Sequence, residues 1–275
     1  MSEDPFRIRA HVPAFEAISA EYRTRSDEVR RTVPNRLDVA YGPAPDERLD
    51  LFFPANPVSA PVHLFVHGGY WRANVKEDYA FVAAPVVAAG GIAAIVEYTL
   101  MPKARMAALV DQVRRAAQWL ARNAASFGGD PSRLSASGTS AGGQLAFYLA
   151  ARRPQEDQLP HASVRSLLLV SGIYDLDPIT RSFVQPEIGL TADEVRDWSP
   201  VGAQVSRDTR FMLAVGSAET APFHEQADTL QAVITRQGGA AERLLVRGAD
   251  HMSIMLEMGT PATVLARALE TCVRR

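Results

Sequence analysis

The pattern of apolar and polar positions changes near residue 62 of this 275-residue chain. Before that point, residues 36–41 and 48–53 alternate between apolar and polar side chains, and a turn rich in glycine and proline separates them. This pattern predicts an antiparallel hairpin, preceded by a polar helix over residues 14–33 that ends at Pro34. After residue 62, short and nearly continuous apolar runs indicate strands that are buried on both faces.

These apolar runs alternate with segments of helical character. The predicted strands cover residues 62–66, 92–96, 134–136, 164–170, 210–215 and 243–246. The predicted helices cover residues 79–89, 103–125, 144–150, 222–236 and 254–273. Strands that alternate with helices predict an α/β fold, in which a mostly parallel central sheet is covered by helices on both faces. We therefore expect a single domain over residues 1–275.

Residues 177–207 interrupt this alternation. The segment holds several prolines and glycines, and only residues 192–198 suggest a short helix. In a parallel sheet, ligands bind beyond the carboxyl ends of the strands. An insertion that leaves that edge is expected to lie over the binding site as a small cap.

Composition narrows the class of protein. A net charge of -2 gives no electrostatic reason to expect nucleic acid or an anionic membrane as a partner. No apolar run approaches the roughly 20 residues that span a bilayer, and no secretory signal is visible. A single cysteine, Cys272, excludes an intramolecular disulfide and fits the cytoplasm. The helix that carries Cys272 is a candidate contact in a homodimer, although nothing in the sequence requires a dimer.

The residues from Gly138 to Gly142 read G-T-S-A-G, between a predicted strand and a predicted helix. A serine on such a turn leaves the path of the strand, so its hydroxyl can meet a substrate. The flanking glycines leave room where a β-carbon would collide. Ser140 is therefore the predicted nucleophile, and it needs a neighbouring base to take its proton.

The acid and the base are expected after later strands, in the order serine, acid, histidine. His251 lies in a loop after the final predicted strand, and His224, on a predicted helix, is a weaker alternative. Glu219 follows the penultimate strand, where a carboxylate would orient the histidine and stabilise its cation. Asp175, one strand earlier, is a rival for the acid.

The oxyanion that forms during acyl transfer needs backbone N–H groups aimed at it. One donor is expected at Ala141, directly after the nucleophile. The loop after the first buried strand reads H-G-G-Y-W and is expected to supply donors at Gly69 and Tyr70. Gly68 would shape the turn, and His67 would hold the loop through a side-chain hydrogen bond.

Aromatic side chains on loops at the same edge either line an acyl or aryl pocket or pack the loops on one another. These residues are Tyr70, Trp71, Tyr174, Phe183 and Trp198. The histidines lack the spacing of metal ligands, so no metal is expected. The paired glycines lack the spacing of a phosphate loop or a dinucleotide fingerprint, so no cofactor is expected.

The motifs resemble those of the α/β-hydrolase superfamily over nearly the whole chain. The H-G-G loop at His67 and the G-T-S-A-G-G segment from Gly138 are similar to the H-G-G branch of esterases and lipases. The H-G-G-Y-W stretch is similar to the H-G-G-x-W pattern of kynurenine formamidases, also called arylformamidases. S-G-I-Y-D-L at residues 171–176 and G-S-A-E at residues 216–219 are similar to stretches in bacterial relatives. At the position of Thr139, many members of this superfamily carry a histidine, which is not one of the three catalytic side chains (serine, acid and histidine).

This resemblance implies a serine hydrolase that needs no cofactor and acts on N-formylkynurenine or a related aryl formamide. A short-chain carboxylesterase is the alternative. A binding module on an inactive hydrolase scaffold is a remote alternative, because a serine, a histidine and a suitable acid are all present in the sequence.

Overall fold

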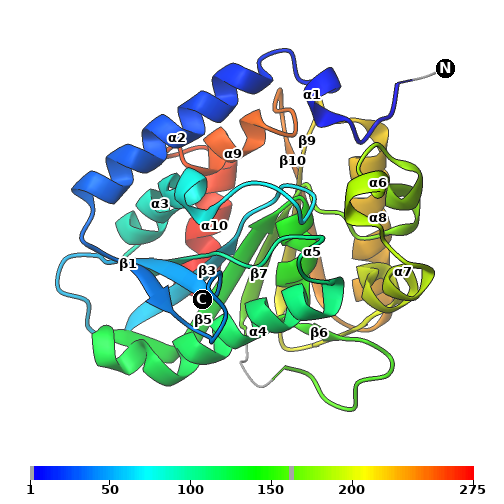
Figure 1. Ribbon diagram of the computed structural model, residues 1–275. Coiled ribbons are helices and arrows are strands. Elements are labelled where there is room, and N and C mark those ends of the chain that lie inside the picture. The colour runs from blue at the N-terminus through cyan, green and yellow to red at the C-terminus, as the bar shows by residue number, and fades with distance from the viewer. Residues whose placement is uncertain (1–2, 161–163) are drawn as a thin grey trace.

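Eight strands form one central sheet in the computed structural model, which describes residues 3–160 and 164–275 (Figure 1). The strands, in their spatial order, are β1 (Asn35–Ala40), β2 (Arg48–Phe52), β4 (Ile92–Val96), β3 (Ala60–Val66), β5 (Gly129–Thr139), β7 (Ser166–Val170), β9 (Arg210–Gly216) and β10 (Ala240–Val246). The strands from β4 to β10 in this order pair in parallel, whereas β1 and β2 form an antiparallel hairpin that joins β4. The predicted parallel sheet and N-terminal hairpin are both confirmed.

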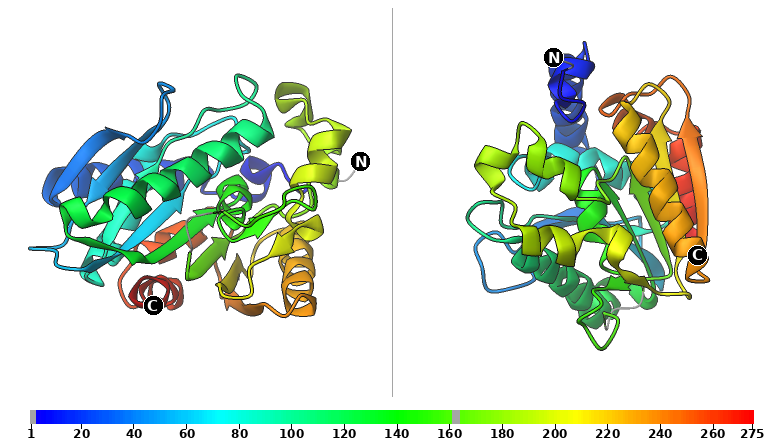
Figure 2. Two further views of the ribbon diagram at one scale, coloured as in Figure 1. Left: turned by 90° about the horizontal axis from the view of Figure 1, so that it is seen from below. Right: turned by 90° about the vertical axis from the view of Figure 1, so that its right-hand side faces the viewer.

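Helices cover both faces of the sheet. They are α1 (Ile8–His11), α2 (Phe15–Thr32), α3 (Ala83–Ala88), α4 (Met106–Asn123), α5 (Ala141–Phe147), α6 (Gln185–Ile188), α7 (Ala192–Trp198), α8 (Ala221–Arg236), α9 (Ser253–Met258) and α10 (Val264–Arg274). Figure 2 shows α4 and α10 on opposite faces of the sheet. The stripe of α4 that includes Val110, Val113 and Leu120 is buried, as its helical spacing requires.

Three sequence predictions need correction in detail. The helix predicted over residues 254–273 is two helices, because Gly259 ends α9 and Pro261 cannot continue it, and Thr263 then caps α10. The helix predicted over residues 79–89 begins as a 3-10 helix, η1 (Lys76–Val82), before α3. The strand that carries the serine motif begins at Gly129, since Gly128 already ends the preceding helical turn with a φ of 83°.

The insertion at residues 177–207 contains more regular structure than expected. Besides the predicted helix α7 it holds α6 and two 3-10 helices, η3 (Asp177–Arg181) and η4 (Pro200–Gly202). Near its end, β8 (Gln204–Val205) pairs with β6 (Ala151–Arg152) in a separate two-stranded sheet. This pairing fastens the insertion to the chain that follows α5.

The N-terminal segment crosses the edge of the sheet where the parallel strands end, as Figure 1 shows for α1 and α2 in blue. Side-chain hydrogen bonds hold its first residues there. The carboxylate of Asp4 accepts the N–H of Phe183 at 2.7 Å, and the carbonyl of Pro5 accepts the hydroxyl of Thr220 at 2.9 Å. No helix within the described ranges has both the length and the apolar character of a bilayer span.

Candidate active site

Ser140 occupies a sharp turn between β5 and α5, with φ of 53° and ψ of -125°. Residues with a β-carbon rarely adopt this conformation, so the surrounding structure must hold it in place. A β-carbon on Gly142 would lie 2.2 Å from the carbonyl oxygen of His67, and one on Gly138 would lie 2.3 Å from that of Gly142. The two glycines of the motif therefore permit backbone contacts that no other residue allows.

His251, in the loop after β10, contacts Glu219, in the loop after β9. Its Nδ1 lies 2.7 Å from Oε2 of Glu219. The other oxygen of Glu219 accepts the N–H of Gly216 at 2.7 Å and the hydroxyl of Ser171 at 2.5 Å. The ring of Phe223 packs 4.3 Å from the imidazole centroid. Because Nδ1 is engaged by a carboxylate, Nε2 is the ring nitrogen left for proton exchange.

Asp175, the rival for the acid, and His224, the alternative base, do not take part in this contact. The carboxylate of Asp175 accepts the N–H of Asp177 at 3.0 Å, and Glu219 takes the contact with the histidine. His224 lies on α8 and is outside the lining of the cavity that Ser140 and His251 share. Ser171, which bonds to Glu219, was missed by the sequence reasoning, although it follows the end of β7 as the other site residues follow their strands.

The loop after β3 approaches the serine turn closely. A β-carbon on Gly68 would lie 2.9 Å from the carbonyl oxygen of Thr139, and one on Gly69 would lie 2.2 Å from that of Ala73. Gly69 and Tyr70 both have positive φ values, 113° and 51°. Residues with a β-carbon seldom hold such values, so the surrounding contacts must fix this loop.

The N–H groups expected to face an oxyanion are free of other partners. Within residues 3–160 and 164–275, those of Gly69, Tyr70 and Ala141 donate to no acceptor. Ala141 is the first residue of α5, where helical N–H groups have no partner inside the helix. Gly69 and Tyr70 line the same cavity as Ser140.

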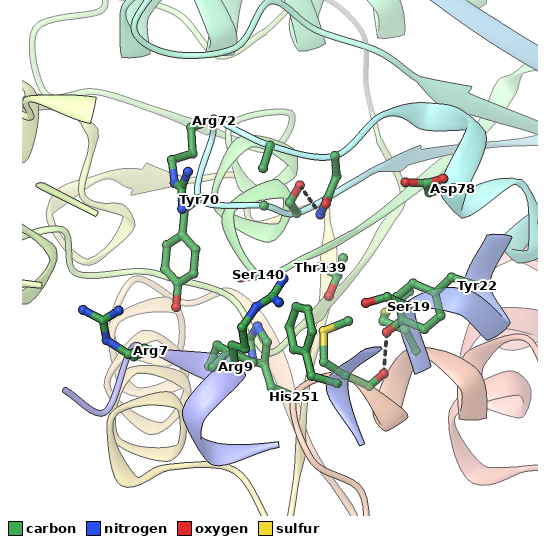
Figure 3. Close-up of a pocket in the computed structure, with 18 of the residues that line it drawn as sticks. Arg7, Arg9, Ser19, Tyr22, Tyr70, Arg72, Asp78, Thr139, Ser140 and His251 are labelled. Carbon is green, nitrogen blue, oxygen red and sulfur yellow. Dashed lines mark hydrogen bonds between the residues drawn. The ribbon is translucent and has the colours of Figure 1, made fainter. Parts of the chain in front are cut away.

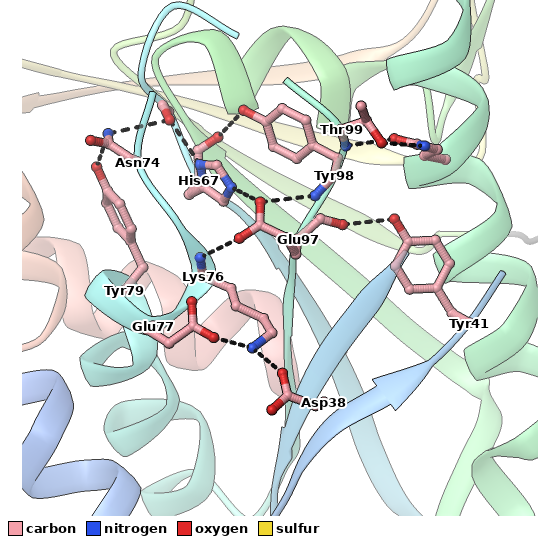
Figure 4. A network of polar contacts seen from close by, with 12 residues as sticks. Asp38, Tyr41, His67, Asn74, Lys76, Glu77, Tyr79, Glu97, Tyr98 and Thr99 are labelled. Atoms are coloured by element: carbon pink, nitrogen blue, oxygen red, sulfur yellow. Dashed lines mark hydrogen bonds and ion pairs between the residues drawn. The ribbon is translucent and has the colours of Figure 1, made fainter. Parts of the chain in front are cut away.

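His67 is buried beneath this loop and bonded at both ring nitrogens (Figure 4). Nδ1 lies 2.8 Å from the carbonyl oxygen of Gly68, and Nε2 lies 3.0 Å from Oε1 of Glu97. The ring of Tyr98 stacks on the imidazole at 4.5 Å, and its hydroxyl donates to the carbonyl of His67 at 3.0 Å. These contacts fix the loop from behind.

Glu97 connects this loop to a deeper group of charges. Burial by itself would raise the pKa of its carboxyl, but hydrogen bonds from His67 and from the amides of Lys76 and Tyr98 hold the pKa below its ordinary value. The buried Lys76 ammonium lies 2.7 Å from Asp38 and 3.0 Å from Asp50. Sequence reasoning missed Glu97, yet its place directly after β4 was a signal that could have found it.

A cavity of about 720 Å³ lies above Ser140 and His251 (Figure 3). Its floor includes Gly68, Gly69 and Tyr70. Much of its wall comes from α1, α2 and the residues beside them, and the insertion contributes Phe183 and Glu187. The expected cap is therefore only part of the cover, and the N-terminal segment supplies the larger part.

Three aromatic residues predicted as pocket candidates are buried packing residues outside the cavity lining. Trp71 donates its indole N–H to Gln144 at 3.0 Å, and the Gln144 amide donates to the carbonyl of Trp198 at 3.0 Å. Tyr174 is also buried, and its ring occupies the space that a β-carbon on Gly172 would need. Within the described ranges, no group of His, Cys, Asp and Glu side chains is arranged to hold a metal ion.

Comparison with known proteins adds to this geometry. Residues 49–211, which include the serine turn and the loop after β3, match the BD-FAE family. The chain belongs to the BD-FAE family. The kynurenine formamidase of Danio rerio is 29% identical over 269 residues, which cover 95% of this chain and 87% of that protein. Esterase LipC of Mycobacterium tuberculosis is 30% identical over 249 residues, which cover 80% of this chain and 60% of LipC.

The fold of this BD-FAE member is also found among solved structures. The thermophilic carboxylesterase EstE1, cloned from a metagenomic library, superposes with a TM-score of 0.75 over 100% of each chain, at 16% sequence identity. The sheet order, the family and these relatives show that the chain is a hydrolase with the α/β-hydrolase fold.

Proposed function

We propose that this chain is a serine hydrolase, similar to kynurenine formamidase, that cleaves a small ester or aryl formamide through an acyl-enzyme on Ser140. The observation that carries the proposal is the 2.7 Å contact between His251 and Glu219, next to a cavity that both Ser140 and His251 line. A nucleophile, a base and an orienting carboxylate are the three groups that this chemistry requires.

In the proposed first step, the hydroxyl oxygen of Ser140 attacks the carbonyl carbon of the substrate, and Nε2 of His251 takes the proton of that hydroxyl. The carbonyl oxygen becomes an oxyanion that accepts hydrogen bonds from the N–H groups of Gly69, Tyr70 and Ala141. As the bond to the leaving amine or alcohol breaks, His251 gives its proton to that group. Water, deprotonated by His251, then attacks the acyl carbon; as the bond to the oxygen of Ser140 breaks, His251 returns the proton to that oxygen, and the acid product leaves.

Glu219 would hold the imidazole in the required tautomer and stabilise the imidazolium that forms twice in each cycle. Its hydrogen bonds to Gly216 and Ser171 support this role, because they fix the carboxylate before the reaction begins. Such preorganised charge costs no rearrangement when the transition state forms.

The size and lining of the cavity support a small aromatic substrate. A volume of about 720 Å³ lies within the usual range of roughly 300–1,000 Å³ for small-molecule sites. Phe15, Tyr22, Tyr70 and Phe183 contribute aromatic surface to it. Together with the likeness to kynurenine formamidase, this favours N-formylkynurenine or a related aryl formamide. The likeness to LipC keeps a short-chain carboxylester as the second candidate.

We also propose that residues 1–275 act as one domain, with residues 177–207 as a cap-like insertion. Each group of the proposed machinery comes from one chain, so the chemistry does not require a homodimer. The buried, unpaired Cys272 supports a reducing compartment, the cytoplasm, as the place of action. Sedimentation of the purified protein and imaging of a tagged chain would test these two points.

The test of the proposal is the Ser140→Ala variant, assayed on p-nitrophenyl acetate and on N-formylkynurenine. We expect turnover of both substrates to disappear while circular dichroism shows an intact fold. Retained activity would exclude Ser140 as the nucleophile. The ratio of kcat/KM values on the two substrates for the unaltered protein would then decide between formamide and ester.

A further inference from the structure

Three arginines, Arg7, Arg9 and Arg72, gather on one side of the cavity and are called the arginine cluster below. All three line the cavity, and Figure 3 shows Arg7 and Arg72 beside Tyr70 and Arg9 between Tyr70 and His251, with Asp78 at the opposite end. Two of them flank one aromatic ring. Cζ of Arg7 lies 4.7 Å and Cζ of Arg72 lies 5.9 Å from the centroid of Phe183. Two guanidinium groups held around the same ring repel each other unless an anion joins them.

The carboxylates of the protein near the arginine cluster neutralise it only in part. Arg72 pairs with Glu187 and Arg9 with Glu16, and these carboxylates are 56% and 71% exposed. Exposed pairs of this kind contribute little, so a ligand can readily replace one partner. Arg7 forms no ion pair within the described part of the chain.

Among the described residues, two further acidic groups near the cavity form no ion pair with the arginine cluster. The carboxylate of Asp4 accepts the backbone N–H groups of Phe6 and Phe183. Asp78 lies on the far side of the cavity. The pKa of Asp78 is raised mainly by burial, and the positive charge of Arg23 partly offsets this effect.

A backbone hydrogen bond connects Arg72 to the loop that carries the proposed oxyanion donors. Its N–H donates to the carbonyl of Gly69 at 3.0 Å, so it belongs to the same tight loop as the proposed oxyanion donors. Its Nε is buried and has no hydrogen-bond partner among the described residues. Nε is therefore closed to a ligand in this conformation, and a substrate carboxylate would accept hydrogen bonds from the Nη groups, in place of the exposed Glu187.

We propose that the arginine cluster binds a carboxylate carried by the substrate, so that the enzyme selects esters or formamides that carry a carboxylate over those that lack one. The inference rests on the proposed function, because it places the scissile carbonyl at Ser140. The Tyr70 side chain extends from the proposed oxyanion loop to Phe183, whose ring lies 5.4 Å away. The carboxylate would therefore lie beyond this aromatic pair, at the other end of the substrate from the reacting bond.

The experiment compares two substrates that differ only in this charge, N-formylkynurenine and its methyl ester, with cleavage of the formamide followed in both. We expect the unaltered enzyme to favour the carboxylate by about tenfold or more in kcat/KM, mainly through KM. The double variant Arg7→Gln/Arg72→Gln should lower that ratio about tenfold, and 0.5 M salt should lower it for the unaltered enzyme. Arg31→Gln/Arg122→Gln is the matched control, because it also removes two positive charges, from exposed positions on α2 and α4 outside the cavity.

The outcomes separate this inference from the proposed function. If the unaltered enzyme cleaves both formamides with equal kcat/KM, or if the double variant keeps the ratio of the unaltered enzyme, the inference is overturned while the hydrolase proposal stands. A second pair, 4-nitrophenyl hemisuccinate and its methyl ester, repeats the comparison on esters. If the enzyme cleaves neither pair, the proposed function fails, and this inference fails with it.

Discussion

Loops that follow β3, β5, β9 and β10 form the floor of the cavity. Residues 3–32 lie over it and are called the cover below. Different kinds of contact hold these two regions in place. In the floor, buried groups bond to each other: His67 has a partner at each ring nitrogen, and Glu219 has donors on both oxygens. Between the two regions, single hydroxyls form hydrogen bonds: the hydroxyl of Tyr70, in the floor, donates to the carbonyl of Phe6, and that of Tyr22, in the cover, donates to the carbonyl of Met252.

This difference assigns different tasks to the two regions. Several backbone and side-chain constraints fix each group of the floor, so a change there should alter kcat. An apolar face of the cover that includes Phe6, Ile18 and Tyr22 is buried against the rest of the protein, whereas several of its charged groups are exposed, so a change there should alter KM or local stability. The variants below test this division, beginning with the largest expected effect.

Glu219→Gln should lower kcat by roughly 10³–10⁴, because the imidazolium loses its charged partner and the histidine can adopt the wrong tautomer. The matched control is Asp175→Asn, which removes a carboxylate from the neighbouring loop without touching the histidine. Steady-state kinetics on N-formylkynurenine measures both. If Asp175→Asn caused the greater loss, the role of the acid would move to Asp175.

Gly69→Ala should lower kcat by roughly 10²–10³, the usual cost of losing an oxyanion donor. The new β-carbon would collide with the carbonyl of Ala73 at a φ of 113° and push the loop away from Ser140. Gly202→Ala is the control, since a β-carbon there meets nothing within 4 Å. Similar kcat values for the two variants would argue against a role for this loop.

Glu97→Gln should lower the free energy of unfolding by about 1–3 kcal/mol at pH 7, because the bonds from His67, Lys76 and Tyr98 lose their charged acceptor. The pKa of Glu97 is depressed in the folded protein. Its contribution is therefore complete above the ordinary value of 4.5 and disappears as the pH falls through the lower folded pKa.

Urea titrations at pH 7 and at successively lower pH measure this difference between the variant and the unaltered protein. We expect the gap to be widest at pH 7 and to narrow in acid. Glu28→Gln, at an exposed position on α2, is the control and should show no gap at either pH. A gap that widens in acid would exclude a stabilising charged role for Glu97.

Tyr22→Phe should have the smallest effect, a loss of about 0.5–1.5 kcal/mol in stability with little change in kcat. It removes the bond from the cover to the carbonyl of Met252, beside His251. Tyr148→Phe is the matched control, because that buried hydroxyl has no partner within the described residues. Equal unfolding midpoints for the two variants would show that the Tyr22 bond does not hold the cover.

Much of the floor could be predicted from the sequence because each of its groups follows the end of a strand. The elbow at Ser140 needs glycines at fixed offsets, and the tight loop at Gly68 and Gly69 needs them as well. These are local requirements that leave a pattern in the sequence. The order of Ser140, Glu219 and His251 along the chain then follows from the topology of the sheet.

The cover could not be predicted in this way. Its helices are polar and amphipathic, and a sequence pattern does not say which surface such a helix packs on. Trp71 and Trp198 were pocket candidates because they lie on loops at the active edge, but both are buried by packing around Gln144. Burial of an aromatic side chain depends on residues that are distant in the sequence, whereas strand ends and glycine turns depend on residues that are close in the sequence.

The most direct measurement is the site of covalent labelling by a fluorophosphonate, located by mass spectrometry of the digested protein. We predict one adduct on the peptide that contains Ser140, slower labelling in Glu219→Gln, and none in Ser140→Ala. An adduct on another residue, or an unaltered protein that resists labelling, would contradict the assignment of Ser140 as the nucleophile.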